Sequence, residues 1–202
     1  QEIEAVLSAA ELGHQPFVVG HSYGGFMTMR FAADRGHQIG GAVIVDSPIQ
    51  RPEDGAETPG PPPDMRRPRL YPDFETGASR FSLRPKQSCE NDFIVEFIAK
   101  HSLKPASEEE GWTWKFDPNV MHPRRFGEPF HQHLAAVTCR AALIFGEQSA
   151  LVSRATATYM SELMGPVAPV VEIPEAQHHV MLDQPLAFVA ALRTLLDVWV
   201  RN

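Results

Sequence analysis

The sequence predicts an α/β fold, in which a parallel sheet is flanked by helices. Short unbroken apolar runs, typical of strands that are buried on both faces, recur towards both ends of the chain. Most of these runs are followed by a segment whose apolar residues have helical spacing. The middle of the chain lacks this alternation. A length of 202 residues with 43% hydrophobic content suits one such domain that carries an insertion.

The N-terminal part predicts a strand–helix–strand unit. Apolar spacing indicates a helix over residues 2–12, and an apolar run indicates a strand over 17–19. A second helix is expected over 24–34, with Gly36 just past its end, and a second strand over 42–45. Two strands joined by a helix in this way are parallel, with a right-handed crossover.

The C-terminal part repeats this rhythm. Ser153 is expected to cap a helix that Gly165 ends. Together the two parts predict a core of four parallel strands, formed by residues 1–47 and 136–202. The expected C-terminal elements are a strand over 141–145, a helix over 153–164, a strand over 170–173 and a helix over 183–199.

Residues 48–135 are predicted to be an insertion. Residues 51–73 hold many of the 18 prolines and show no periodicity, which predicts a loop. The apolar spacing from Phe93 to His101 predicts a helix. His131 and His133 fit one face of a strand as a metal pair, but a polar loop is the preferred interpretation.

The composition argues against several classes of function. A formal net charge of −7 argues against a nucleic-acid partner. No apolar run approaches the roughly 18 residues that a membrane span needs, and no signal-peptide pattern opens the chain. Cys89 and Cys139 lack metal-type spacing, so two free thiols in a reducing compartment are expected. A cytoplasmic protein is the resulting expectation.

One motif with a chemical meaning lies between the first predicted strand and its helix. Its pattern is G-x-S-x-G, and this strand–turn–helix context is the one that the pattern requires. The tight turn is expected to project the Ser22 hydroxyl at the carboxyl edge of the sheet, where the Tyr23 N–H can donate to an oxyanion. Glycine alone is expected to fit at residues 20 and 24. The alternative is a chance Gly-Ser loop. The turn consists of Gly20, His21, Ser22, Tyr23, Gly24 and Gly25.

The base for this serine is expected among nine histidines, and position selects His178. The segment IPEAQHHVMLDQP over residues 173–185 follows the last predicted strand. With the GHSYGG turn, it resembles the α/β-hydrolase superfamily, whose final loop commonly contains P-x-A-G-H-x-x-x-x-E-x-P. On this register His178 matches the catalytic histidine, Gln177 replaces the usual glycine and Asp183 replaces the usual glutamate.

The neighbouring His179 is expected to serve in packing or in a surface contact. A metal site made of the two adjacent histidines is the weaker alternative, because their side chains diverge and no third ligand is near in sequence. The resemblance implies no metal and no cofactor.

The sequence leaves open which residue is the acid that accompanies Ser22 and His178. The superfamily usually carries it after the strand predicted at 141–145, but Ser149 and Ala150 stand at the expected positions. Some lipases and dehalogenases carry the acid one strand earlier, which here is Asp46. The reserve candidate is Glu147, and the structural alternative for Asp46 is a turn former before Ser-Pro. The order Ser22, Asp46, His178 keeps the nucleophile–acid–base order of the fold.

The resemblance implies a serine hydrolase that acts on a carboxylic ester through an acyl-enzyme, and an apolar ester of medium size is the expected substrate. A carbon–carbon bond hydrolase and a non-catalytic binding protein on the same scaffold stay open as alternatives. The insertion is expected to be a mostly helical, aromatic-rich cap, and an oligomer is possible.

The fold of this superfamily begins with strands that this sequence lacks. One oxyanion donor and a neighbour for the strand over 17–19 would be missing with them. We expect the 202-residue chain by itself to self-associate through the unpaired strand edge and to be nearly inactive.

Overall fold

The computed structural model describes residues 2–12, 14–54, 69–107, 110–117 and 128–201. The chain divides into two compact units. Gln1–Ala56 and Pro129–Asn202 form the first, called the sheet unit below, and Glu57–Glu128 form the second, called the insert unit.

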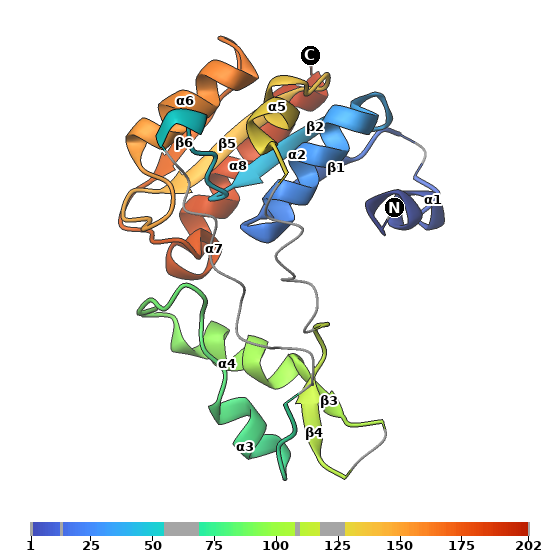
Figure 1. The fold of residues 1–202 in the computed structure, drawn as a ribbon, viewed down its shortest axis with the longest axis vertical. Helices are drawn as coiled ribbons and strands as arrows, with labels where there is room; N and C mark the ends of the chain where they lie inside the picture. Colours follow the sequence, from blue (N-terminus) through green and yellow to red (C-terminus); the bar gives the residue numbers. More distant parts are fainter. Residues whose placement is uncertain (1, 13, 55–68, 108–109, 118–127, 202) are drawn as a thin grey trace. The chain divides into compact units, whose positions relative to one another are not determined.

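The sheet unit alternates strands and helices in the order that the sequence predicts (Figure 1). Its elements are α1 (Glu2–Ala9), β1 (Phe17–His21), α2 (Tyr23–Arg35), η1 (Gly36–Gln38), β2 (Gly41–Val45), η2 (Pro52–Asp54), α5 (Phe130–Ala135), β5 (Ala141–Gly146), α6 (Arg154–Met164), β6 (Val170–Ile173), α7 (Val180–Asp183) and α8 (Pro185–Arg201).

The four strands of this unit form one sheet in the order β1-β2-β5-β6, and all neighbours are parallel. The predicted α/β fold with a parallel sheet is therefore confirmed. In the register, His21 pairs with Val45, and Val45 pairs with Ile144. The carboxyl ends of β1, β2 and β5 are thus nearly level, so the residues that follow these strands meet at one edge of the sheet.

Helices cover both faces of the sheet, as Figure 1 shows. Ile44 and Leu143 pack with α2, α5 and α6 on one face. Val43 and Ile144 pack with α7 and α8 on the other. All residues of β2 and β5 are buried, which explains why these strands are unbroken apolar runs.

The segment around His131 and His133 is helix α5, so the prediction of a polar loop is wrong. Phe130 and Leu134 lie four residues apart on one face of this helix, and both are buried in the core beside Met29 of α2. Their burial attaches α5 to the sheet unit, so the two units divide after Ala56 and after Glu128 rather than at 48 and 135. A six-residue helix offers too few turns for its periodicity to be recognised in the sequence.

The insert unit contains two helices and a short hairpin in its described part. The predicted helix near residues 93–101 is confirmed as α4, and the Pro-rich segment lies largely outside the described residues. The role of this unit as a cap stays a prediction. Its elements are α3 (Phe74–Ser79), α4 (Asp92–His101), β3 (Leu103–Pro105) and β4 (Trp112–Trp114), the two strands being antiparallel.

Within the described ranges, no helix combines the length and the hydropathy that crossing a membrane requires.

Close packing at the start of α2 requires glycine at positions 20 and 25. A Cβ at Gly20 would lie 2.3 Å from the carbonyl oxygen of Gly24, and a Cβ at Gly25 would lie 1.9 Å from Ser47 Oγ. A Cβ at Gly24 would meet nothing within 4 Å, so the expectation that only glycine fits there is wrong. The constrained position is one residue later because Gly25, and not Gly24, faces the chain that follows β2.

We predict opposite effects of alanine at these two adjacent helix positions. Gly25→Ala should lower the free energy of unfolding by about 1–3 kcal/mol, because the methyl group displaces Ser47. Gly24→Ala should be neutral or stabilising by up to about 1 kcal/mol, because alanine is the better helix former. Urea unfolding of both variants measures the difference, and equal stabilities would contradict the close contact between Gly25 and Ser47.

Candidate active site

Ser22 sits in a strained turn between β1 and α2. Its φ of 52° and ψ of −118° lie outside the regions that a side chain prefers. Such a conformation persists only where neighbouring contacts enforce it. Here the Ser22 N–H donates to the Val45 carbonyl at 2.9 Å, and the Ser22 carbonyl accepts from the Ser47 hydroxyl at 2.7 Å. The end of β2 therefore holds the serine backbone from both sides.

The loop after β6 carries His178 to the same edge of the sheet. The Ala176 carbonyl accepts from the Gln148 N–H at 2.8 Å, which ties the loop to the end of β5. The Asp183 carboxylate accepts from the Gln177 N–H at 2.7 Å. Asp183 is the residue that stands in place of the usual glutamate, and it orders the chain just before the histidine. His178 is 1% exposed as a result.

Ser22, His178 and Asp46 form one hydrogen-bonded chain. The Asp46 Oδ1 atom accepts from His178 Nδ1 at 2.8 Å, and His178 Nε2 lies 3.0 Å from Ser22 Oγ. A carboxylate only accepts, so the proton of the neutral ring is on Nδ1 and the Nε2 lone pair faces the serine hydroxyl. This arrangement lets His178 take the Ser22 proton while Asp46 stabilises the resulting imidazolium.

The Asp46 carboxylate is fully buried and accepts hydrogen bonds from three residues. Besides His178, the Gly146 N–H donates to Oδ2 at 2.9 Å and the Ser149 hydroxyl donates to Oδ1 at 2.6 Å. The Ser149 oxygen also accepts from the N–H groups of Leu151 and Val152, both at 3.1 Å. With both lone pairs engaged, this hydroxyl points its proton at Asp46.

Ser149 was noted from the sequence only because it stands where the superfamily usually has a carboxylate. The signal that could have indicated its role is the hydroxyl itself, which stands where a relative's acid would reach the histidine.

The reserve candidate Glu147 faces another part of the loop. Its Oε2 atom accepts from the Glu175 N–H at 3.0 Å, and its Oε1 atom lies 3.7 Å from Arg154. The Nδ1 atom of His178 is engaged by Asp46 instead.

The other residues of the turn also lie at this edge. Tyr23 is the first residue of α2, so its N–H points out of the positive end of the helix dipole. His21 ends β1 and donates from Nε2 to the His178 carbonyl at 2.9 Å. Burial lowers the pKa of His21 below its ordinary value, although the hydrogen bond to His178 opposes this shift.

Three histidines meet beside Ser22, and sequence reasoning missed this cluster. The ring of His21 lies 4.6 Å from that of His178 and 5.3 Å from that of His179, measured between centroids. The argument that no third ligand accompanies His178 and His179 holds along the sequence but not in space. His21 ends β1 and His178 follows β6, which lie at opposite ends of the strand order, so no local sequence signal indicates that the two residues meet.

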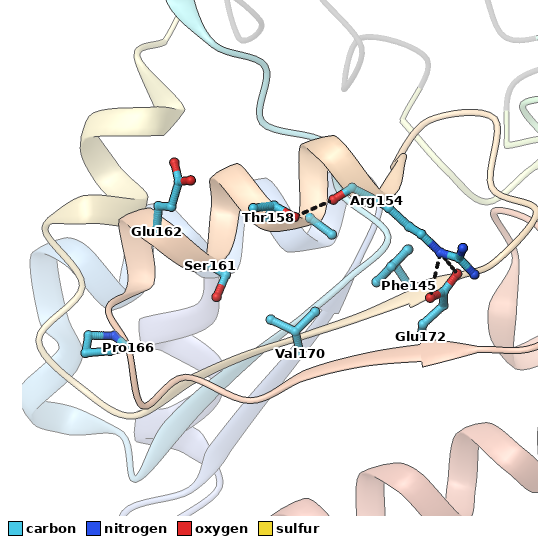
Figure 2. A pocket seen from close by; sticks show the side chains of 9 residues that line it. Phe145, Arg154, Thr158, Ser161, Glu162, Pro166, Val170 and Glu172 are labelled. Carbon is cyan, nitrogen blue, oxygen red and sulfur yellow. Dashed lines mark hydrogen bonds and ion pairs between the residues drawn. The ribbon is translucent and has the colours of Figure 1, made fainter.

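A cleft of about 730 Å³ opens elsewhere on the sheet unit, beside α6 and β6 (Figure 2). Phe145, Val170 and residues of α6 line it, and the Arg154–Glu172 ion pair at 2.8 Å lies at one end. Its lining contains none of Ser22, Asp46 and His178.

Comparison with known proteins agrees with this fold. The sequence matches the family model described as the alpha/beta hydrolase family over residues 2–192. No curated protein matches the sequence significantly.

Several solved structures share the fold. An E-2-(acetamidomethylene)succinate hydrolase superposes with a TM-score of 0.75 at 22% identity, covering 97% of this chain and 71% of its own. The thioesterase domain from the curacin biosynthetic pathway gives 0.69 at 22% identity, covering 96% and 71%. The esterase Rv0045c from Mycobacterium tuberculosis gives 0.69 at 22% identity, covering 97% and 65%. With a family model matched over nearly its whole length, the chain belongs to the alpha/beta hydrolase family.

Proposed function

We propose that this protein is a serine hydrolase that cleaves carboxylic esters through an acyl-enzyme. The observation that carries the proposal is the continuous hydrogen-bonded chain from Ser22 Oγ through His178 to the buried Asp46 carboxylate. The thioesterase and the esterase among the similar structures support acyl transfer as the reaction class.

In the proposed mechanism, His178 Nε2 takes the Ser22 proton as Ser22 Oγ attacks the ester carbonyl carbon. The Tyr23 N–H donates to the oxyanion that forms. The C–O bond to the alcohol then breaks, and the leaving oxygen takes the proton from His178. Water repeats the same steps on the acyl-enzyme, which releases the acid and restores Ser22.

The strained turn suits this role. A positive φ at Ser22 presents the hydroxyl at the edge of the sheet, while the bonds to Val45 and Ser47 hold the backbone. The entropy cost of orienting the serine is therefore met during folding and does not add to the barrier of the reaction. A small molecule with an apolar acyl or alcohol part is the substrate class that we propose.

A fluorophosphonate probe tests the proposal, because it labels only an activated serine. We expect slow labelling, in keeping with the low activity expected of the 202-residue chain, that reaches one label per chain by intact-mass analysis and is absent on Ser22→Ala. Asp46→Asn should slow labelling by about 10⁴-fold, because the wrong tautomer of His178 then faces the serine. Glu147→Gln is the matched control and should label at nearly the parent rate.

Labelling that persists in Ser22→Ala, or that fails in Glu147→Gln and survives in Asp46→Asn, would contradict these assignments. Absence of labelling in the folded parent chain would favour a binding protein on this scaffold. Turnover of p-nitrophenyl esters, compared with a vinylogous ketone, separates an esterase from a carbon–carbon bond hydrolase.

We also predict that Ser149 is a positioning residue that acts through Asp46. Ser149→Ala should lower kcat about 10- to 100-fold with little change in KM, since a hydrogen bond to a charged group contributes about 1.5–3 kcal/mol. Ser149→Thr keeps a hydroxyl and should restore most of the loss.

Ser153→Ala is the control for Ser149→Ala. It removes a serine that caps α6 and should lower stability by about 1 kcal/mol without changing kcat. If Ser149→Ala affects only stability, as Ser153→Ala does, the positioning role is wrong.

A further inference from the structure

The three histidines beside Ser22 have the composition of a transition-metal site. One ring nitrogen from each of His21, His178 and His179 lies within 4.8 Å of the corresponding nitrogens of the others. The acyl-transfer mechanism uses only His178, so the approach of the other two rings has no part in it. Imidazole nitrogen is a preferred ligand of Zn²⁺, Cu²⁺ and Ni²⁺, whereas Mg²⁺ and Ca²⁺ prefer oxygen ligands.

The rings of His178 and His21 have the outer hydrogen bonds that metal-binding histidines need. A ligating histidine almost always donates its other N–H to a carboxylate or a backbone carbonyl, which fixes the tautomer and turns a lone pair towards the ion. His178 donates from Nδ1 to Asp46, and His21 donates from Nε2 to the His178 carbonyl. These bonds leave Nε2 of His178 and Nδ1 of His21 as lone-pair donors.

The electrostatic surroundings also favour a cation. The buried Asp46 carboxylate lies directly behind His178 and contributes a negative charge at short range.

We propose that His21, His178 and His179 bind a transition-metal ion of the Zn²⁺, Cu²⁺ or Ni²⁺ class, and that this ion inhibits the enzyme by occupying the His178 lone pair. Three metal–nitrogen bonds form as three water ligands leave the ion, and no electron is transferred. The ion acts as an inhibitor and not as a cofactor, because it takes the lone pair that must accept the Ser22 proton.

The geometry requires a modest approach of the rings. Metal–nitrogen bonds of about 2.0–2.1 Å in a tetrahedral site put ligand nitrogens about 3.3 Å apart. The half-buried His179 precedes the short helix α7 and is the ligand best placed to supply this movement. Ser22 Oγ, 3.0 Å from His178 Nε2, or a water molecule completes the coordination.

Metal binding is tested without reference to activity. Zn²⁺ is titrated into the full chain in competition with a chromophoric chelator, and Cu²⁺ is added for electron paramagnetic resonance. We expect one ion per chain and hyperfine structure from three nitrogens. His179→Phe keeps a ring but removes the ligand. It should weaken Zn²⁺ binding at least about ten-fold, since loss of an outer hydrogen bond alone costs 10- to 100-fold.

His37→Phe is the matched control for this variant. His37 is an exposed histidine of the same unit outside the cluster, so its loss should leave Zn²⁺ affinity unchanged. The spectrum of the parent protein tests the site even if a variant fails to fold. A spectrum with one nitrogen, or equal Zn²⁺ affinities for His179→Phe and His37→Phe, would overturn the proposal.

Inhibition rests on the proposed function and is measured separately. Zn²⁺, Cu²⁺ and Ni²⁺ should protect Ser22 from the fluorophosphonate, a chelator should restore labelling, and Mg²⁺ and Ca²⁺ should have no effect. The Zn²⁺ concentration for half protection should rise at least about ten-fold in His179→Phe, relative to its own rate without metal.

The two proposals fail in different ways. Binding through three nitrogens in a protein that never labels would support the metal site and refute the hydrolase. Labelling that Zn²⁺ does not slow would support the hydrolase and refute the inhibitory site.

Discussion

The candidate site and the strand ends that form it depend on one buried carboxylate. Asp46 is removed from water, and a buried charge costs several kcal/mol unless hydrogen bonds replace its hydration. Donors from the end of β5, from the loop that follows it and from His178 supply that replacement. The same three bonds join the end of β2 to the two segments that follow it in the sheet. The charge is satisfied only when these segments are in register, so the site and the fold stabilise each other.

The fold could be predicted because its strands are buried on both faces. The segments 41–45 and 141–146 are apolar at every position or nearly so, and Ser153 and Gly165 mark the ends of α6 by their capping chemistry. The boundaries between the two units were predicted less accurately than the strands and helices. It depends on Phe130 and Leu134 packing against α2, a contact that spans about a hundred residues of sequence.

One member of the candidate site, Asp46, could be predicted because a carboxylate is missing at the usual position. Residues without carboxylates at 149 and 150 directed attention to Asp46, whose carboxylate lies 2.8 Å from the His178 ring. The contributions of Ser149 and His21 were not predictable, since each is a distance between elements that only folding brings together. The packing at the turn was predicted one position too early. Which glycine is constrained depends on where Ser47 lies, and no pattern within residues 20–25 encodes that.

Three consecutive residues, the last of β2 and the two that follow it, contact both ends of the hydrogen-bonded chain. Val45 and Ser47 hold the Ser22 backbone, and Asp46 between them holds His178. Two hydrogen bonds between the turn after β1 and the end of β2 therefore set the spacing between Ser22 and Asp46, because Asp46 is covalently held between the two residues that make them. A fluctuation that opens this strand end releases both residues at once. The Ser22 and Asp46 amides, which donate to Val45 and Ile144, thus belong to one cooperative unit in hydrogen exchange.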